Sequence, residues 1–326
     1  MIQTLRIIET NCLNPYENLA MEQFLLENQP KDSMTLYLWQ NKNTVVIGRN
    51  QNPWKECRTG LLEEEGGLLS RRLSGGGAVF HDIGNLNFTF LTSNEDYDVD
   101  KQLSVIQTAC AFSGITAEKS GRNDLLADGR KFSGNAFYHN KDFAYHHGTL
   151  MIDVDTDKLG RYLSPPKAKL EAKGVASVRS RVVNLNQLAP SLTCETMKVF
   201  MRNAFQEVYG MQAEEISLSH RDREEIAKIS QTISSWDYLY GKPLPFTFAC
   251  ESHFSWGHIQ LQLEAKNGVI QAVKIYSDAM DWSLPEKAEA ALTGCRFVIG
   301  DMAAALSAAV PQYGEDLILM LRQQGV

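Results

Sequence analysis

The sequence lacks the patterns that mark several large classes of protein. Its six cysteines, at positions 12, 57, 110, 194, 250 and 295, form no CxxC pair and no metal-like grouping with histidine, so neither a zinc site nor a disulfide framework is indicated. No apolar run approaches the roughly 20 residues that a membrane span needs, and the first residues contain no signal-peptide core. A net charge of −7 argues against a basic, nucleic-acid-binding surface. We therefore expect a cytoplasmic protein with no membrane segment and no nucleic-acid partner.

What the sequence does contain are signals for an α+β fold. Its 326 residues are enough for one large core and a smaller one, on a prior of roughly 150 residues per domain. Strand and helix patterns alternate up to Pro243 and Pro245, which mark the best linker, and hairpin strands followed by helices come after it. We predict a large mixed-sheet domain over residues 1–244 and a small α+β accessory domain over residues 245–326.

Several elements have clear ends. Asn14 is a good N-cap for a helix from Pro15 to about residue 28, and Gly210 should end a helix over residues 193–209. A third helix is expected over residues 100–113, and a fourth from Asn52 to the glycines at 66 and 67. The dipeptide Asp128-Gly129 is a strong signal for a tight β-hairpin turn.

The most unusual stretch is RRLSGGGAVFHDIGN, over residues 71–85. Each ordered glycine loses more conformational entropy than any other residue, so three in succession indicate that something approaches this backbone closely. With Arg71 and Arg72 before the glycines and His81 after them, we expect an anionic ligand held by N–H groups and a guanidinium. The alternative is a flexible turn that binds nothing, since the stretch matches neither a P-loop nor GxGxxG.

Lys131 follows the hairpin turn, on the strand face opposite to Phe132. An ammonium group there could sit between a carboxylate and a phosphate and stabilise negative charge as it moves. Asn123 and Asp124 could face a metal-bound triphosphate, although both are also common turn residues. The alternative for Lys131 is an ordinary solvated lysine, because lysines are rarely buried.

Two further groups could contribute to a site. His146 and His147 point to opposite faces of a strand, so only one of them can line a given site, and a structural role is expected for the other. Residues 167–181, KAKLEAKGVASVRSR, hold five cations and a single acid in a chain of net negative charge. That patch could attract a phosphate or an acidic partner, or it could simply be a solvated loop.

Six segments together resemble the bacterial lipoate-protein ligase family. They occur in the family's order and spacing across nearly the whole of residues 1–250, and the C-terminal region resembles the family's accessory domain more loosely. The segments are TVVIGRNQNPWKEC (44–57), RRLSGGGAVFHDIGN (71–85), SGRNDLL (120–126), DGRKFSGNA (128–136), YHHGTL (145–150) and KGVASVRSRVVNL (173–185). The resemblance implies a catalytic domain of the biotin/lipoate ligase and octanoyltransferase type.

The resemblance also implies the chemistry. Such enzymes use ATP with Mg²⁺ to convert lipoate to lipoyl-AMP, release pyrophosphate, and transfer the lipoyl group to a lysine of an acceptor protein. The acceptors implied are the lipoyl domains of 2-oxoacid dehydrogenase E2 subunits and the glycine cleavage H protein.

The roles of individual residues follow from the same resemblance. Lys131 would be catalytic and would contact both the acyl carboxylate and the α-phosphate. The nucleotide would be bound by Arg72, Gly77, Ala78, Val79 and Phe80, and lipoate by Gly75 and Gly76. From the residues themselves, we expect Asn123 and Asp124 also to bind the nucleotide, and His147 and Gly148 also to bind lipoate. Lys173, Arg179 and Arg181 would lie in a loop over the adenylate or against the acceptor. Metal ligands cannot be assigned. Leu73 departs from the serine that related enzymes often have, which affects loop packing more than chemistry.

Three alternatives remain. An octanoyltransferase on the same scaffold would need a cysteine nucleophile, and none of the cysteines lies in the glycine-rich, Lys131 or HHG motifs. A biotin ligase would need an arginine-glycine phosphate loop that is absent. A non-catalytic lipoate-binding protein would bind lipoate without ATP-dependent pyrophosphate exchange.

Overall fold

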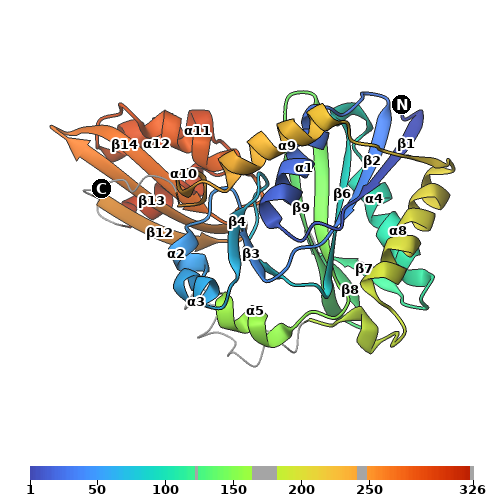
Figure 1. Cartoon of the computed structure of the whole chain (residues 1–326). Helices are drawn as coiled ribbons and strands as arrows, with labels where there is room; N and C mark the ends of the chain where they lie inside the picture. Colours follow the sequence, from blue (N-terminus) through green and yellow to red (C-terminus); the bar gives the residue numbers. More distant parts are fainter. Residues whose placement is uncertain (122–123, 164–181, 241–247, 324–326) are drawn as a thin grey trace. The chain divides into compact units, whose positions relative to one another are not determined.

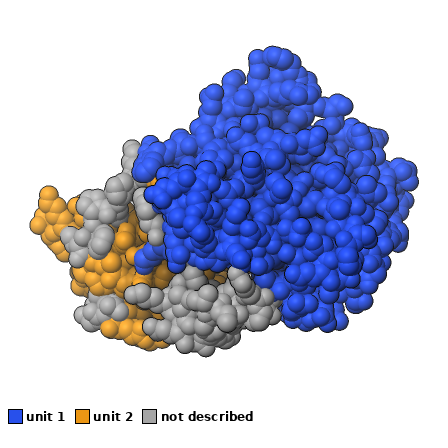
Figure 2. Space-filling model, turned by 60° about the horizontal axis from the view of Figure 1, so that its bottom comes forward, with its two compact units in different colours: residues 1–46, 54–70, 79–239 blue, residues 47–53, 71–78, 240–326 orange. Residues whose placement is uncertain are grey.

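The computed structural model of the chain describes residues 1–121, 124–163, 182–240 and 248–323 (Figure 1). Contacts divide the chain into two compact units, which Figure 2 colours separately. Unit 1 comprises residues 1–46, 54–70 and 79–239, and unit 2 comprises residues 47–53, 71–78 and 240–326. The predicted boundary between residues 244 and 245 lies outside the described residues and stays a prediction. Within the described ranges, no helix has the length and apolarity to cross a membrane.

Unit 1 is built on one mixed sheet of eight described strands, in the order β11-β1-β2-β6-β10-β9-β8-β7. The pairs of β1 with β2 and with β11 are parallel, and the other pairs are antiparallel. This sheet confirms the prediction of an α+β fold with a large mixed sheet. The strands are β1 (Thr4–Glu9), β2 (Ser33–Trp39), β6 (Asn85–Ser93), β7 (Ala117–Ser120), β8 (Asp124–Ala127), β9 (Arg130–His139), β10 (Phe143–Met151) and β11 (Ala213–Glu215).

The two faces of this sheet differ in chemistry. On the apolar face, Phe88, Phe90 and Leu150 are fully buried in a core that also contains side chains of helices α4 (Val99–Ala111) and α8 (Cys194–Tyr209). On the polar face, Thr89 and His147 lie beneath helix α1 (Pro15–Glu27), which packs against β6 and β10. The sheet therefore places a hydrophobic core on one side and a set of buried polar groups on the other.

Most of the predicted helices are confirmed, and one is wrong. Asn14 caps α1 by accepting the Tyr16 N–H at 2.9 Å, and Gly210 ends α8 at a φ of 68°. The predicted single helix from Asn52 to Gly66 is instead two short helices, α2 (Pro53–Glu56) and α3 (Thr59–Glu64). Cys57 leaves the helix to form a β-bridge with Leu163, a tertiary contact that local sequence does not reveal. The other described helices of this part of the chain are α5 (Thr156–Tyr162), α9 (His220–Ile233), α10 (Trp236–Tyr240) and the 3-10 turns η1 (Asn94–Asp96) and η2 (Leu185–Gln187).

The Asp128-Gly129 turn forms as predicted and feeds a bulged strand. Both turn residues have positive φ, 52° and 69°, which is the backbone that two-residue hairpin turns require. In the ladder between β8 and β9, Leu125 pairs with Ser133 but Leu126 pairs with Lys131. One extra residue, Phe132, is therefore inserted into β9, and the alternation of its side chains reverses there. Phe132 stays in the apolar core, and Lys131 turns to the polar face.

A small sheet joins β3 (Thr44–Ile47), β4 (Leu68–Arg71) and β5 (Val79–His81), with β3 in the centre. Unit 2 has its own sheet, β12 (Phe248–Phe254), β13 (Gly257–Lys266) and β14 (Val269–Ser277), packed with helices α11 (Leu284–Leu292), α12 (Ile299–Ala309) and α13 (Gly314–Arg322). Its separate core of aliphatic side chains, with Ile259, Leu261 and Leu306 fully buried, matches the predicted small α+β domain.

Candidate functional site

Lys131 lies on the polar face with its chain laid across a glycine. A Cβ at Gly134 would come within 3.2 Å of the Lys131 Nζ, so the missing side chain at 134 leaves room for the ammonium group. The Lys131 backbone is fixed because its carbonyl accepts the Val183 N–H at 2.9 Å. The side chain remains 38% exposed. A fixed backbone together with an accessible ammonium group is the arrangement that a substrate-binding lysine needs.

Asp124 is the partner of this lysine. The Asp124 Oδ1 lies 2.7 Å from the Lys131 Nζ, and both side chains are about one-third exposed. Asp124 pairs directly with Gly134 across strands β8 and β9, so the strand register places its carboxylate on the same face of the sheet as Lys131. Because the pair is half-open to solvent, its attraction is screened and an anionic ligand can compete for the ammonium group.

A buried polar network continues along the same face beneath α1. The carboxylate Oε1 of Glu22 lies 2.8 Å from His147 Nδ1 and accepts the Thr89 hydroxyl at 2.7 Å. The indole N–H of Trp39 donates to the Thr89 oxygen at 3.1 Å. Glu22 is only 2% exposed, so these partners take the place of water around its carboxyl group. His147, predicted to bind lipoate, is thus fixed by Glu22, an acid that the sequence analysis did not single out.

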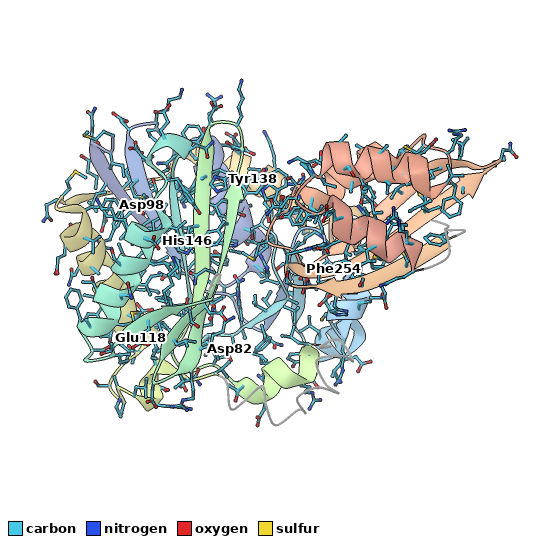
Figure 3. All side chains as sticks on the ribbon, turned by 180° about the vertical axis from the view of Figure 1, so that it is seen from behind. Asp82, Asp98, Glu118, Tyr138, His146 and Phe254 are labelled. Atoms are coloured by element: carbon cyan, nitrogen blue, oxygen red, sulfur yellow. The ribbon has the colours of Figure 1, made fainter. Side chains whose placement is uncertain are left out.

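His146, its neighbour on β10, is labelled in Figure 3, and strand alternation places it on the opposite face of the sheet. Its Nδ1 lies 3.0 Å from Gln102 Oε1 and its Nε2 lies 2.8 Å from Asn135 Oδ1. Burial, together with the nearby His147, lowers the pKa of His146 to about 3. A neutral imidazole donates from one nitrogen only, so one of the two amides must present its NH₂ group. His146 is therefore a structural histidine, as expected for one member of the pair.

Gly148 also belongs to the apolar face. A Cβ there would come within 2.6 Å of the Phe88 ring and 2.7 Å of Asn135 Oδ1. Packing alone explains why this position has no side chain. A role of Gly148 in lipoate binding stays a prediction.

The glycine loop, residues 74–77, is described within unit 2. The buried guanidinium of Arg72 donates to the carbonyl oxygens of Gly75 at 2.8 Å and Gly77 at 2.7 Å, and to the Ser74 hydroxyl at 3.1 Å. Arg71 in turn donates to the carbonyls of Gly48, Arg49 and Gln51. Both arginines therefore brace the loop backbone, a use that the expectation of anion binding did not include.

The remaining predicted residues divide into two groups. Ala78 follows the loop, and Val79 and Phe80 begin β5, where Phe80 is buried against Tyr162 at a ring distance of 5.4 Å. Asn123 and the cations Lys173, Arg179 and Arg181 lie outside the described residues. Among the described residues, no group of three histidine, cysteine or acidic side chains could hold a metal ion.

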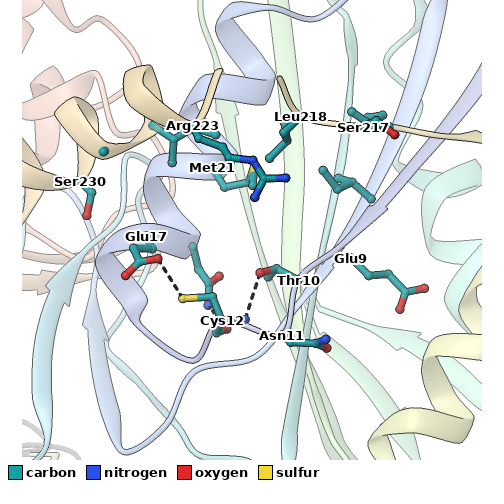
Figure 4. A pocket seen from close by; sticks show the side chains of 15 residues that line it. Glu9, Thr10, Asn11, Cys12, Glu17, Met21, Ser217, Leu218, Arg223 and Ser230 are labelled. Carbon is teal, nitrogen blue, oxygen red and sulfur yellow. Dashed lines mark hydrogen bonds between the residues drawn. The ribbon is translucent and has the colours of Figure 1, made fainter. Parts of the chain in front are cut away.

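A described pocket of about 780 Å³ lies elsewhere in unit 1, between the end of β1, helix α1 and helix α9 (Figure 4). Glu17 and Cys12 form one wall, with the thiol 3.3 Å from the carboxylate, and Arg223 comes from α9. None of the predicted site residues lines it. The predicted chemistry is therefore not concentrated in this pocket.

Glu22, Thr89 and Trp39 are the residues that the sequence reading missed. A signal for Glu22 was present, since Asn18 and Glu22 stand four residues apart among the apolar residues of α1 and both are buried. Thr89 and Trp39 carry no such signal, because a threonine and a tryptophan in strands are ordinary core residues.

Comparison with known proteins places these features in a family. The family described as "Lipoyl protein ligase A/B catalytic domain" matches residues 14–206, and "Bacterial lipoate protein ligase C-terminus" matches residues 244–317. Lipoate-protein ligase A of Psychrobacter cryohalolentis is 41% identical over 303 residues, which cover 90% of this chain and 89% of that protein.

Solved structures agree. LipL1 of P. falciparum, solved in complex with lipoate, superimposes with a TM-score of 0.85 at 28% identity over 98% of this chain and 99% of its own. The bi-partite lipoate protein ligase of Thermoplasma acidophilum, studied with its E2 lipoyl domain, gives a TM-score of 0.67 at 23% identity over 76% of this chain and 100% of its own. The second likeness shows a common fold. On the family matches and the 41% identical relative, the chain belongs to the lipoyl protein ligase A/B family.

Proposed function

We propose that this protein is an ATP-dependent lipoate-protein ligase that forms lipoyl-AMP and transfers the lipoyl group to a lysine of an acceptor domain. Membership of the family supports the class of reaction. The observation that carries the catalytic assignment is Lys131, a lysine with a fixed backbone and an accessible ammonium group lying across Gly134.

In the first step, a carboxylate oxygen of lipoate attacks the α-phosphorus of ATP. A new P–O bond forms, the bond to the bridging oxygen of pyrophosphate breaks, and pyrophosphate leaves with the electron pair. Two anions must approach each other, so a cation near both lowers the barrier. Lys131 supplies that cation, and releasing it from Asp124 is the change that substrate binding requires.

In the second step, the amine of the acceptor lysine attacks the carbonyl carbon of the mixed anhydride. The C–O bond to AMP breaks, AMP leaves as the phosphate anion, and the amine loses a proton as the amide forms. Lys131 can stabilise the oxyanion and then the departing phosphate. The chain needs no general base if the acceptor amine arrives deprotonated.

We assign the other residues as the sequence analysis predicts. Arg72, Gly77, Ala78, Val79, Phe80, Asn123 and Asp124 would bind the nucleotide; Gly75, Gly76, His147 and Gly148 would bind lipoate; Lys173, Arg179 and Arg181 would lie near the adenylate or the acceptor. The buried contact of His147 with Glu22 supports a fixed polar group at the lipoate site. Mg²⁺ would arrive with ATP, and the part-exposed carboxylate of Asp124 is the kind of oxygen ligand that it prefers.

The acceptors we propose are the lipoyl domains of 2-oxoacid dehydrogenase E2 subunits and the glycine cleavage H protein. The Thermoplasma relative studied with its E2 lipoyl domain supports the first class. The cytoplasmic location stays a prediction.

Five of the six thiols do not favour an octanoyltransferase. Burial raises the pKa of Cys57, Cys110 and Cys194 to about 12 and that of Cys250 to about 11. Burial also raises the pKa of Cys12, where Glu17 adds to the effect. A thiol with so little thiolate at neutral pH is a poor acyl acceptor.

The test is acceptor modification followed by mass spectrometry, with ATP, Mg²⁺ and lipoate, and with ATP omitted as the control. Lys131→Ala should lower lipoate-dependent pyrophosphate exchange about a hundredfold or more, as expected for loss of an electrostatic catalyst. Lys141→Ala, an exposed lysine in the turn between β9 and β10, is the matched control and should keep the wild-type rate. Exchange near the wild-type rate in Lys131→Ala would refute the catalytic assignment.

A further inference from the structure

The glycine loop of unit 2 is in direct contact with a segment of the C-terminal region, Ser277–Trp282, here called the clasp. The Gly76 N–H donates to the Ala279 carbonyl at 3.2 Å. A Cβ on Gly75 would come within 2.4 Å of that same oxygen and within 2.8 Å of the Met280 carbonyl oxygen. Any side chain at 75 would therefore collide with two backbone carbonyls of the clasp.

The clasp is tied at both ends to residues 47–53. At one end, the Ser277 N–H donates to the Asn50 carbonyl at 2.8 Å. At the other, the Asn50 side-chain amide donates to the Trp282 carbonyl at 2.7 Å. The Arg49 guanidinium lies 4.7 Å above the Trp282 ring, a cation–π contact that adds to the attachment. Asn50 thus holds the clasp by its backbone and its side chain.

The three glycines differ in what they require. Gly76 has a φ of 86°, which favours glycine, and Gly75 has no room for a side chain because of the clasp. A Cβ on Gly77, by contrast, would meet no atom within 4 Å. Close approach of a ligand is therefore not needed to explain the first two glycines, since the protein itself occupies that space.

We propose that the clasp is a positioning segment for the reaction, and that Asn50 is a positioning residue. By accepting the Gly76 N–H and filling the space beside Gly75, the clasp sets the conformation of the loop proposed to bind lipoate. The inference rests on the proposed function for its catalytic consequence, but the contact itself does not. A segment of the C-terminal region, the clasp, thereby becomes part of the proposed active site.

Hydrogen exchange measured by mass spectrometry on the full chain tests the contact directly. In Gly75→Ala, amide exchange in peptides covering residues 72–78 and 277–282 should rise about tenfold or more, since the Gly76 hydrogen bond is lost and the segment opens locally. In Gly77→Ala, exchange of the 277–282 peptide should stay at the wild-type rate. Wild-type exchange in Gly75→Ala, or an equal rise in both variants, overturns the proposal.

Asn50→Ala tests the proposed effect of the clasp on lipoate binding without a substitution in the glycine loop itself. Loss of one hydrogen bond to Trp282 should raise the KM for lipoate in pyrophosphate exchange about fivefold and leave kcat within about twofold. Faster exchange of the 277–282 peptide with unchanged KM and kcat overturns the positioning role. If the wild-type protein itself shows no pyrophosphate exchange, the proposed function fails, and the hydrogen-exchange comparison still decides whether the clasp holds the loop.

Discussion

The pH dependence of folding should reveal the neutral, buried state of His146. The side chain has no exposed surface, and its pKa is lowered from 6.5 to about 3 by burial and by the adjacent His147. The unfolded chain therefore binds a proton below about pH 6.5 that the native protein does not. The stability that this site contributes is complete above that pH and is lost as pH falls towards the folded value.

The size of the effect follows from the two pKa values. Between pH 7 and pH 5, one such histidine should remove about 2 kcal/mol from the free energy of unfolding. That loss is a large fraction of the stability of a typical domain, about 5–15 kcal/mol. Substituting a side chain that cannot titrate, His146→Gln, should remove this part of the pH dependence, whatever the substitution does to the absolute stability.

Denaturant titrations at pH 7 and pH 5 measure the difference for each variant. The wild type should lose about 2 kcal/mol more than His146→Gln between the two pH values. Equal losses in the wild type and His146→Gln would refute the argument, because they would mean that the buried imidazole does not resist protonation.

Three further predictions follow from packing and charge. Glu22→Gln should raise the KM for lipoate about tenfold with little change in the KM for ATP, because the carboxylate fixes His147, the proposed lipoate contact. Steady-state pyrophosphate exchange measures both KM values, and equal changes in the two would contradict this role of Glu22. Gly84→Ala should destabilise unit 1 by about 2 kcal/mol or more, because its Cβ would lie 2.0 Å from a backbone carbonyl oxygen. Gly60→Ala should instead stabilise unit 1 by about 0.5–1 kcal/mol, because a Cβ there meets open space in a helix. Thermal unfolding of the two variants compares these effects. Neutralising Arg179 and Arg181 together should slow acceptor lipoylation and leave the unfolding temperature unchanged; unaltered rates of both steps would identify a solvated loop.

Helix ends and tight turns were predictable because their causes are local. Asn14 and Gly210 act through their own backbone and the next few residues, and Asp128-Gly129 needs only two positive φ angles. The broken helix at Cys57 was not predictable, since the pairing with Leu163 involves residues more than a hundred positions away. Local patterns carry no information on such partners.

The sequence singled out candidate site residues but not the partners that fix them. Lys131 and His147 were singled out because a lysine and a histidine stand near glycines, and Asp124 because its carboxylate could face a metal-bound triphosphate. The partners that fix them depend on register, as with Asp124 opposite Gly134, or on a helix that crosses the sheet, as with Glu22 of α1. The clasp could not be predicted from the sequence, because it contacts the glycine loop through backbone groups that any residue could supply.

The bulge at Phe132 determines which face of β9 carries Lys131. Ser133 and Leu125 pair on the apolar face, so strict alternation without the bulge would place Lys131, two residues before Ser133, in the core among phenylalanine and leucine side chains. An ammonium group there would have no counter-charge and would be strongly disfavoured. In a library of single-codon deletions, loss of Phe132 should therefore leave Lys131 on the polar face and remove only the packing of one buried ring.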